Sequence, residues 1–338
     1  MLKEHLPDFN NLQAVLKRGK PSKPVLFEFF LNKKLYEFLS GRAEPEDDFE
    51  YAKYLIKAFS RAGYDYATMH LTRKKFFHTH EHDQLESKSL DSEVMITGWK
   101  DMELYKWPIP ENLDLAFLKK LDLELPGNMK IIIYGPSGVL ENAIKLCGYQ
   151  GLCFMLADDE KLAAAVFDKI GNILYKYYEA ASAFSCVGAC IVNDDWGFKT
   201  QTMLGASALR KYVIPWHRKI VKLLHTGKKS VILHSCGNLK EVMNDIIDDI
   251  GFDGKHSFED SIQPVEEAYR EYGSRIAIMG GIDLDFLIRE SAENIKKRVI
   301  NMLELTGTAG YAVGSGNSIP AYCPAEKYFA MTRAAQEY

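Results

Sequence analysis

Short apolar runs alternate with long amphipathic stretches along almost the whole chain. Nine of these runs are four to eight residues long and apolar nearly throughout, which is typical of strands buried on both faces of a parallel sheet. The predicted strands are residues 24–30, 64–71, 129–134, 152–156, 187–193, 230–234, 254–258, 276–279 and 311–314. The predicted helices include residues 48–61, 159–184, 239–250, 264–272, 292–305 and a final helix at 324–337.

This alternation indicates repeated strand–helix–strand units with right-handed connections. About eight units followed by a final helix fit a closed (β/α)8 barrel, the TIM-barrel fold. A doubly wound open sheet has a similar rhythm, but no Gly-x-Gly-x-x-Gly sequence opens the first strand–helix turn. We therefore predict a single α/β barrel domain over residues 1–338, with residues 1–20 as an N-terminal helical extension.

Residues 73–128 interrupt this rhythm. The segment carries aromatic residues and prolines, among them Trp99, Tyr105, Trp107 and Pro110, and predicts an enlarged loop with short helices. Barrel enzymes often build a cover for the active site from such a loop. The segment is therefore either a lid or a surface elaboration packed by its own aromatic side chains, and the sequence leaves both alternatives open.

The composition narrows the class of protein. The chain has 338 residues, a net charge of −4 and 47% hydrophobic residues, which excludes a disordered chain. The near-neutral net charge lacks the excess of basic residues that is typical of proteins that bind nucleic acid or an anionic membrane. No apolar stretch is long enough for a transmembrane helix, and the N-terminus has no apolar segment typical of a secretory signal. Six cysteines without such a signal indicate a reducing compartment, so we expect a cytoplasmic protein without nucleic-acid or membrane partners.

The strongest candidate for chemistry is the sequence His234-Ser235-Cys236, which follows the predicted strand 230–234. Residues two apart in a strand point to the same side, so the imidazole and the thiol can meet at one point. Both groups are preferred zinc ligands, and a tetrahedral site needs only one or two more. Because active sites of barrels lie at the carboxyl ends of the strands, we interpret the pair as part of a metal site.

Other strand ends carry polar residues as well. Asp194 and Asp195 follow the predicted strand 187–193, and paired carboxylates need a metal, a cation or a proton if they are buried. Further polar strand ends are residues 256–260, 279–283 and 314–318. Their convergence on one rim is the layout of a barrel active site.

Several other features have simpler interpretations. The alternating histidines at 78–82 lie in a charged loop and suit a solvated or lid role. His217 lies in a predicted helix and is expected to face solvent or to pack against its neighbours. The cysteines expected to be inert core thiols are Cys147, Cys153, Cys186 and Cys190.

Five segments follow one another in a recognisable order. They are residues 194–197 (Asp-Asp-Trp-Gly), 225–229 (His-Thr-Gly-Lys-Lys), 233–237 (Leu-His-Ser-Cys-Gly), 279–283 (Met-Gly-Gly-Ile-Asp) and 324–326 (Pro-Ala-Glu). Together they resemble the uroporphyrinogen decarboxylase superfamily, and the resemblance extends from about residue 10 onward. Because members of this superfamily are (β/α)8 barrels, the resemblance implies the same fold.

One branch of that superfamily is the porphyrin decarboxylase, which uses no metal and carries arginines after the first strand to hold a polycarboxylate substrate. The corresponding residues 27–34 contain Glu28 and no arginine, and the first 60 residues contain only Arg18 and Arg42. An acidic or apolar rim would repel a polyanionic tetrapyrrole. The resemblance to this branch gives the alternative function, a uroporphyrinogen decarboxylase or related metal-free decarboxylase with Asp195 or His256 as proton donor.

The other branch contains zinc methyltransferases that move a methyl group between a corrinoid protein and a thiol. Their signature is a His-x-Cys pair plus a distant cysteine, and His234 and Cys236 match its first half. The family's second cysteine falls at the strand end that holds Asn317, and Cys323 follows a few residues later. The resemblance therefore implies Zn²⁺ held by His234, Cys236 and Cys323. Related demethylating enzymes lack the second cysteine, in which case oxygen ligands replace it.

We therefore expect a methyltransferase that moves a methyl group between a corrinoid (cobalamin), carried by a partner protein, and a thiol or methylated small molecule at a zinc site. The expected catalytic residues are Asp194, Asp195, His256 and Glu259, of which Asp195 and Glu259 are the alternative oxygen ligands. The expected substrate-binding residues are Glu28, Trp196, Gly281, Asp283 and Asn317. A third interpretation is a substrate- or corrinoid-binding barrel that has lost its activity.

Overall fold

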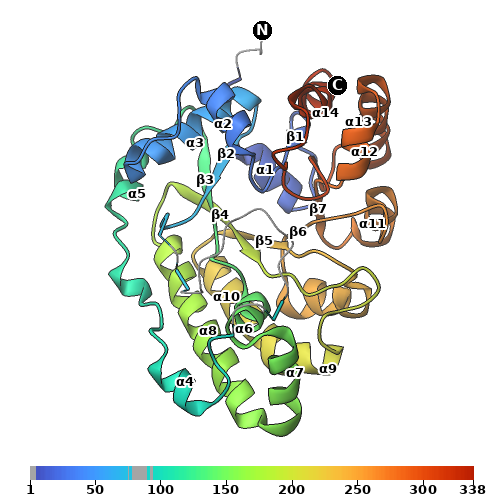
Figure 1. Cartoon of the computed structure of the whole chain (residues 1–338). Coiled ribbons are helices and arrows are strands. Elements are labelled where there is room, and N and C mark those ends of the chain that lie inside the picture. The colour runs from blue at the N-terminus through green and yellow to red at the C-terminus, as the bar shows by residue number, and fades with distance from the viewer. Residues whose placement is uncertain (1–4, 75, 78–89, 92–93) are drawn as a thin grey trace.

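Eight parallel strands form one curled sheet in the computed structural model, which describes residues 5–74, 76–77, 90–91 and 94–338. Helices surround the strands, as Figure 1 shows. The strands are β1 Val25–Leu26, β2 Tyr66–Met69, β3 Lys130–Tyr134, β4 Val187–Asn193, β5 Ser230–His234, β6 Gly254–His256, β7 Ala277–Met279 and β8 Tyr311–Val313. The predicted (β/α)8 barrel is therefore confirmed.

The helices follow the strands in the alternating order that the sequence predicts. They are α1 Phe9–Leu16, α2 Lys33–Ser40, α3 Asp48–Ala62, α4 Trp99–Leu104, α5 Ala116–Leu121, α6 Val139–Cys147, α7 Tyr149–Asp158, α8 Glu160–Ser182, α9 Ala206–Ala208, α10 Ile214–Thr226, α11 Val265–Tyr272, α12 Leu284–Arg289, α13 Ala292–Thr306 and α14 Ala325–Gln336. Asp159 and Ser291 cap α8 and α13, as side-chain oxygens at a helix start are expected to do. The predicted helix 239–250 is helical but begins as the 3₁₀ turn η3 (Lys240–Val242) and ends as the π-helix η4 (Asp245–Ile250).

One predicted strand is wrong. Residues 152–156 lie in α7, where only Leu152 and Met155 are buried, three residues apart on one helical face. Phe154 between them is 60% exposed. A short apolar run of this kind does not by itself distinguish a buried strand from a helix.

The two edge strands of the sheet, β1 and β2, meet without the backbone pairing that joins the other neighbouring strands. Neighbouring strands pair in the order β1-β8-β7-β6-β5-β4-β3-β2, and the described residues form no backbone ladder between β1 and β2. Side-chain hydroxyls from β2 bridge this seam instead. The Tyr66 hydroxyl accepts from the Glu28 N–H at 2.7 Å and donates to the Glu28 carbonyl at 2.9 Å. Thr68 donates to the Phe29 carbonyl at 2.6 Å, so two side chains replace the missing ladder.

Helix α1 closes the barrel at the amino ends of the strands. Its apolar residues Phe9, Leu12, Val15 and Leu16 are buried. Gly188 and Gly254, at the starts of β4 and β6, leave room for these side chains, because a Cβ on either glycine would lie within 3 Å of Phe9 or Leu16. The segment predicted as an N-terminal extension therefore contains a helix that fills one end of the barrel and leaves the carboxyl end for chemistry.

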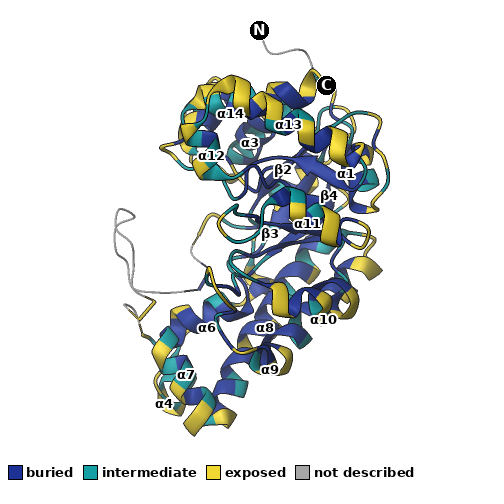
Figure 2. Cartoon of the chain, turned by 90° about the vertical axis from the view of Figure 1, so that its right-hand side faces the viewer, coloured by how far each residue is buried: buried dark blue, intermediate teal, exposed yellow. Residues whose placement is uncertain are grey.

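The enlarged connection between β2 and β3 contains the short helices that the sequence predicts. Much of its described part runs along the outside of the barrel, where the Trp99 indole donates to Asp159 and Glu111 pairs with Lys176. The histidines at 78–82 fall outside the residues that the structure describes. The core is continuous around the strands, and Figure 2 shows buried strands with exposed outer faces on α11, α13 and α14. None of the described helices has the length and apolar character needed to cross a membrane.

The β1–β2 seam makes a testable prediction. Replacing Tyr66 by Phe leaves a buried N–H and a buried carbonyl of Glu28 without partners, so the Tyr66→Phe protein should lose about 1–3 kcal/mol of unfolding free energy. The matched control is Tyr311→Phe, because the buried Tyr311 hydroxyl has no hydrogen-bond partner within the described chain. That variant should be neutral or slightly stabilised. Urea unfolding of the three proteins measures the difference, and equal losses in both variants would contradict a bridging role for Tyr66.

Candidate functional site

Polar side chains meet at the carboxyl ends of β4, β5 and β6. The strand register pairs Asn193 with His234 and His234 with His256, so these three residues lie side by side across the sheet. Asp195 and Cys236 follow two residues beyond Asn193 and His234 on the same edge. The sequence-based prediction of a polar carboxyl rim therefore describes the arrangement of these strands well.

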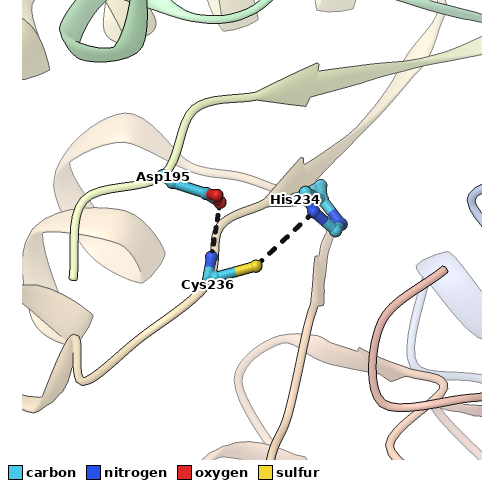
Figure 3. Close-up of side chains that lie close together, drawn as sticks. All are labelled: Asp195, His234 and Cys236. Carbon is cyan, nitrogen blue, oxygen red and sulfur yellow. Dashed lines mark hydrogen bonds between the residues drawn. The ribbon is translucent and has the colours of Figure 1, made fainter. Parts of the chain in front are cut away.

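Three of the predicted site residues form a compact group. The potential ligand atoms of Asp195, His234 and Cys236 all lie within 4.8 Å of one another. The Cys236 thiol lies 3.8 Å from His234 Nε2, and the Cys236 N–H donates to Asp195 Oδ1 at 2.8 Å. Figure 3 shows the Asp195 carboxylate next to the backbone nitrogen of Cys236 and the His234 imidazole next to its sulfur. This is a set of one oxygen, one nitrogen and one sulfur donor around a single point.

Hydrogen bonds determine which nitrogen of His234 carries its proton. His256 Nε2 lies 3.2 Å from the carbonyl oxygen of Ser315, which can only accept, so His256 carries its proton on Nε2. Its Nδ1 is therefore an acceptor, and it receives the proton of His234 Nδ1 across 2.8 Å. As a result, His234 Nε2 presents a lone pair toward Cys236.

Burial keeps both imidazoles neutral. Desolvation is the main cause that lowers the pKa of His256 to about 3 and the pKa of His234 well below its ordinary value. Burial, followed by the nearby Asp195 carboxylate, raises the pKa of the Cys236 thiol to about 12. The pKa of Asp195 is also raised by burial. Burial therefore favours the neutral forms of these side chains. A bound cation would balance the negative charge of a carboxylate and a thiolate and so favour their ionised forms.

The two adjacent aspartates face different surroundings. Asp194 is completely buried and accepts from the N–H groups of Leu140 and Glu141, at 3.0 and 2.9 Å, in the first turn of α6. Its carboxylate also binds His217 Nε2 at 2.8 Å. Sequence analysis placed Asp194 among the catalytic residues, but its oxygens are occupied by a helix terminus and a buried histidine. Asp195 is the aspartate that faces Cys236.

His217 is the residue whose importance sequence reasoning underestimated. It is completely buried in α10, and Trp196 packs edge-on against its ring with the centroids 4.9 Å apart. Trp196 is also completely buried, so this expected substrate-binding residue lies in the packing behind Asp194. In the sequence, the one signal for His217 is its place beside apolar residues in a predicted helix. That place does not reveal a partner as distant as Asp194.

Glu28 and Asn317 lie beside the site, on the side of the seam between β1 and β2. The Glu28 carboxyl group is completely buried, lies 2.6 Å from the Ser315 hydroxyl, and accepts from the Ser315 N–H at 2.7 Å. Burial raises the pKa of Glu28 to about 8. Asn317 Nδ2 donates to the Cys236 sulfur at 3.2 Å. Ser315, which lies in the predicted polar strand end 314–318, therefore connects Glu28 to the imidazole pair.

The remaining predicted residues lie outside the compact group. The Cys323 thiol contacts the Pro324 carbonyl at 3.8 Å and lines a separate cavity beside α2, so its predicted ligand role finds no support in its position. Glu259 lines a small cavity of about 170 Å³ that also includes Ser257. Asp283 caps α12 by accepting from the Phe286 N–H. Gly281 has a φ of +106° and packs against α11, where a side chain would strike Val265.

Two glycines allow close contact between the loop that carries Asp195 and the loop that carries Cys236. Gly237 has a φ of +85°, and a Cβ on it would lie 2.1 Å from the Gly197 carbonyl oxygen. A Cβ on Gly197 would lie 2.9 Å or less from the backbone of Gly237 and Asn238. The loops after β4 and β5 therefore pack backbone against backbone directly beyond the site.

The fold and the site define a (β/α)8 barrel with a carboxylate–imidazole–thiol group at the carboxyl ends of its strands. Residues 115–338 match the profile of the family described as uroporphyrinogen decarboxylase (URO-D). Because this match covers more than half of the chain, the protein belongs to the URO-D family, as the resemblance of its motifs predicted.

Solved structures share the fold at low sequence identity. A methyltransferase from Methanosarcina mazei has a TM-score of 0.72 and 15% identity, over 97% of this chain and 98% of that chain. A candidate vitamin-B12-independent methionine synthase from Listeria monocytogenes has a TM-score of 0.50 and 13% identity, over 94% of this chain and 99% of that chain. No curated protein sequence matches the chain significantly. At these identities the likeness concerns the fold.

The buried Glu28 carboxyl group predicts a pH dependence of stability. Between about pH 4.5 and 8 the unfolded chain ionises this group while the folded protein keeps it protonated, so unfolding releases a proton. This group alone should therefore lower the unfolding free energy as pH rises, by up to about 1.4 kcal/mol per pH unit. In Glu28→Gln this contribution should be absent, and the gain over wild type should grow from pH 5 to pH 8.

The control for that measurement is Glu304→Gln, which removes an exposed carboxylate of α13. Denaturant unfolding at several pH values should give parallel curves for this control and the wild type. Parallel curves for Glu28→Gln and the wild type would instead mean that Glu28 is ionised in the folded protein.

Proposed function

We propose that this protein is a zinc-dependent methyltransferase that moves a methyl group between a corrinoid carried by a partner protein and a thiol or methylated small molecule. The observation that carries the proposal is the group formed by Asp195, His234 and Cys236, with its ligand atoms within 4.8 Å of one another. Membership in the URO-D family and the fold shared with a methyltransferase support this class of reaction.

The donor set fits a zinc ion. Zinc–sulfur and zinc–nitrogen bonds of about 2.3 and 2.0 Å around a tetrahedral ion place the two donors about 3.5 Å apart. Cys236 Sγ and His234 Nε2 are 3.8 Å apart, and the lone pair of Nε2 faces the sulfur. Asp195 would be the third ligand in place of Cys323, which leaves one position for a substrate. When bound, Zn²⁺ supplies the positive charge that deprotonates a thiol and holds it as a nucleophile.

Neighbouring side chains suit anionic forms of Cys236 and Asp195. The N–H that Asn317 donates to the Cys236 sulfur favours the thiolate, because hydrogen bonds to a charged form stabilise it. Lys255 is buried, and its Nζ donates to the carbonyls of Ser235 at 3.4 Å and Ser257 at 2.5 Å. It would therefore hold the backbone on both sides of the site and place a positive charge near the two anionic ligands.

His256 would act on the metal site through His234. It accepts the Nδ1 proton of His234 and thereby keeps Nε2 free for a metal, which is the arrangement that metal-binding histidines commonly need. In this proposal Asp194 positions the loop after β4 through α6 and His217, while Asp195 is the residue that reaches the metal.

The decarboxylase alternative finds less support in this arrangement. Both ring nitrogens of His256 are engaged, and its ring is completely buried, so it has no proton to give to a substrate. Among the described residues that line the cavity beside the site, the cations are Arg73 and Lys74, and Arg73 is paired with Glu44 at 2.9 Å, so this lining has no cluster of free cations for a polycarboxylate. Asp195 is the one predicted proton donor that remains near the rim.

Metal analysis tests the proposed function directly. Purified wild-type protein should hold about one zinc ion per chain after dialysis against a weak chelator, whereas Cys236→Ala and Asp195→Ala should lose it. Cys153→Ala removes a thiol from α7, away from the site, and should keep the metal. Undiminished zinc in Cys236→Ala would contradict the proposal. Uroporphyrinogen decarboxylation that survives chelation would favour the alternative.

The His256–His234 hydrogen bond gives a finer prediction. His256→Leu removes the acceptor for the His234 proton and should weaken metal binding by about 10- to 100-fold. His256→Asn can offer a side-chain oxygen near the position of Nδ1 and should restore much of that loss. Competition with a chromophoric chelator measures the affinities, and the visible spectrum of the cobalt-substituted proteins reports the ligand geometry. Equal affinities for His256→Leu and the wild type would exclude this positioning role.

A further inference from the structure

A cavity of about 600 Å³ opens at the carboxyl ends of β1 to β4, next to the Asp195–His234–Cys236 group. Part of its wall is aromatic and includes Phe30, Tyr51, Phe76, Phe117, Tyr134 and Tyr177. Cavities of this size and lining commonly hold small organic ligands, and aromatic walls favour a flat ring. None of the three proposed metal ligands lines this cavity.

His70 offers a hydrogen-bond acceptor in this cavity. Its Nδ1 lies 3.2 Å from the Tyr134 carbonyl oxygen, which also accepts from the Tyr177 hydroxyl at 2.9 Å. Because a carbonyl only accepts, Nδ1 carries the proton and Nε2 carries a lone pair. Nε2 has no partner among the residues that the structure describes. Burial lowers the pKa of His70 to about 4, so the ring is neutral at neutral pH.

A second polar group lies on the cavity wall beside the metal site. Asn193 ends β4 next to His234, and its side-chain oxygen is buried without a hydrogen-bond partner in the described chain. Rotation about the last side-chain bond lets this amide offer either its oxygen or its nitrogen to a ligand. His70 and Asn193 therefore offer a ligand two polar contacts beside the aromatic part of the wall.

The charged residues of the cavity do not favour an ion. Glu44 and Asp48 are balanced by Arg73 and Lys74 in formal charge. Arg73 pairs with Glu44 at 2.9 Å, and its guanidinium lies 4.2 Å from the centre of the Tyr51 ring. A neutral ligand suits these surroundings better than a polyanion or a quaternary amine.

Phe29 connects the cavity to the metal site. Its ring lines the cavity, and its centroid lies 4.4 Å from that of the His234 ring. A ligand that packs on Phe29 is therefore one aromatic ring away from the proposed metal ligands.

We propose that this cavity binds a neutral phenol, with the aromatic ring between the cavity walls and the hydroxyl group donating to His70 Nε2. This inference goes beyond the proposed function, because it assigns a ligand-binding site and no step of methyl transfer. Binding itself requires neither a metal nor a corrinoid partner.

Fluorescence titration with 2-naphthol tests the proposal, with 2-methylnaphthalene as a probe of the same shape that lacks the hydroxyl. We expect saturable binding of 2-naphthol that is about tenfold tighter than binding of 2-methylnaphthalene, because the apolar probe would cover the His70 acceptor without giving it a hydrogen bond. His70→Leu should weaken 2-naphthol binding by a similar factor and leave 2-methylnaphthalene binding nearly unchanged. Equal affinity of the two probes for the wild type would overturn the proposal.

Two control variants localise the binding. Phe154→Ala alters another cavity of similar volume, about 610 Å³ beside α7, and should leave 2-naphthol affinity unchanged. Phe117→Ala opens the wall of the proposed cavity and should weaken both probes, which tests the location without touching His70. Loss of binding in Phe154→Ala alone would place the ligand elsewhere and contradict the proposal.

A third variant separates this inference from the proposed function. Cys236→Ala, which lacks a proposed metal ligand, should bind 2-naphthol as the wild type does. Retained 2-naphthol selectivity in a protein that binds no zinc would support the phenol site while contradicting the zinc methyltransferase. Zinc binding without selectivity for 2-naphthol would contradict the phenol site alone.

Discussion

The carbonyl oxygen of Ser315 fixes the direction of the hydrogen bonds at the centre of the barrel. A carbonyl can only accept, so His256 has to donate to it, and His234 has to donate to His256 in turn. The free lone pair then appears on the nitrogen next to Cys236. The ends of β5, β6 and β8 thus determine the chemical form of one imidazole. The thiol–imidazole contact depends on this order, since the other tautomer would direct an N–H at the sulfur.

The buried carboxyl groups show how the barrel divides its polar residues between folding and chemistry. Asp194 satisfies two N–H groups at the start of α6 and a histidine of α10, while its neighbour Asp195 reaches the Cys236 N–H. Burying a carboxylate is unfavourable unless it is hydrogen-bonded, and Asp194 has three such partners. Glu28 lacks a cationic partner among the described residues, and its pKa rises instead. One aspartate therefore stabilises the rim on which the other is displayed.

The sequence predicted the parts of this molecule that follow from local periodicity. Seven-residue strand β4 and strand β5 occur at the predicted positions, and the spacing of His234 and Cys236 places both on one side of the strand end. The strand prediction for residues 152–156 failed because a short apolar run fits a helix face equally well. The partnership of Asp194 with His217 and the separation of Cys323 from the site depend on contacts between distant segments. A single sequence carries no record of such contacts, so neighbouring aspartates look equivalent in it.

The close contact of Gly197 with Gly237 has a consequence for how this sequence can change over evolutionary time. Neither glycine supplies a functional group, yet any side chain at either position would force apart the loops that bring Asp195 to Cys236. Replacing one glycine cannot be offset by replacing the other, because each backbone already occupies the space that a Cβ would need. Both positions should therefore tolerate less variation in relatives than the reactive side chains themselves, which can exchange one donor type for another.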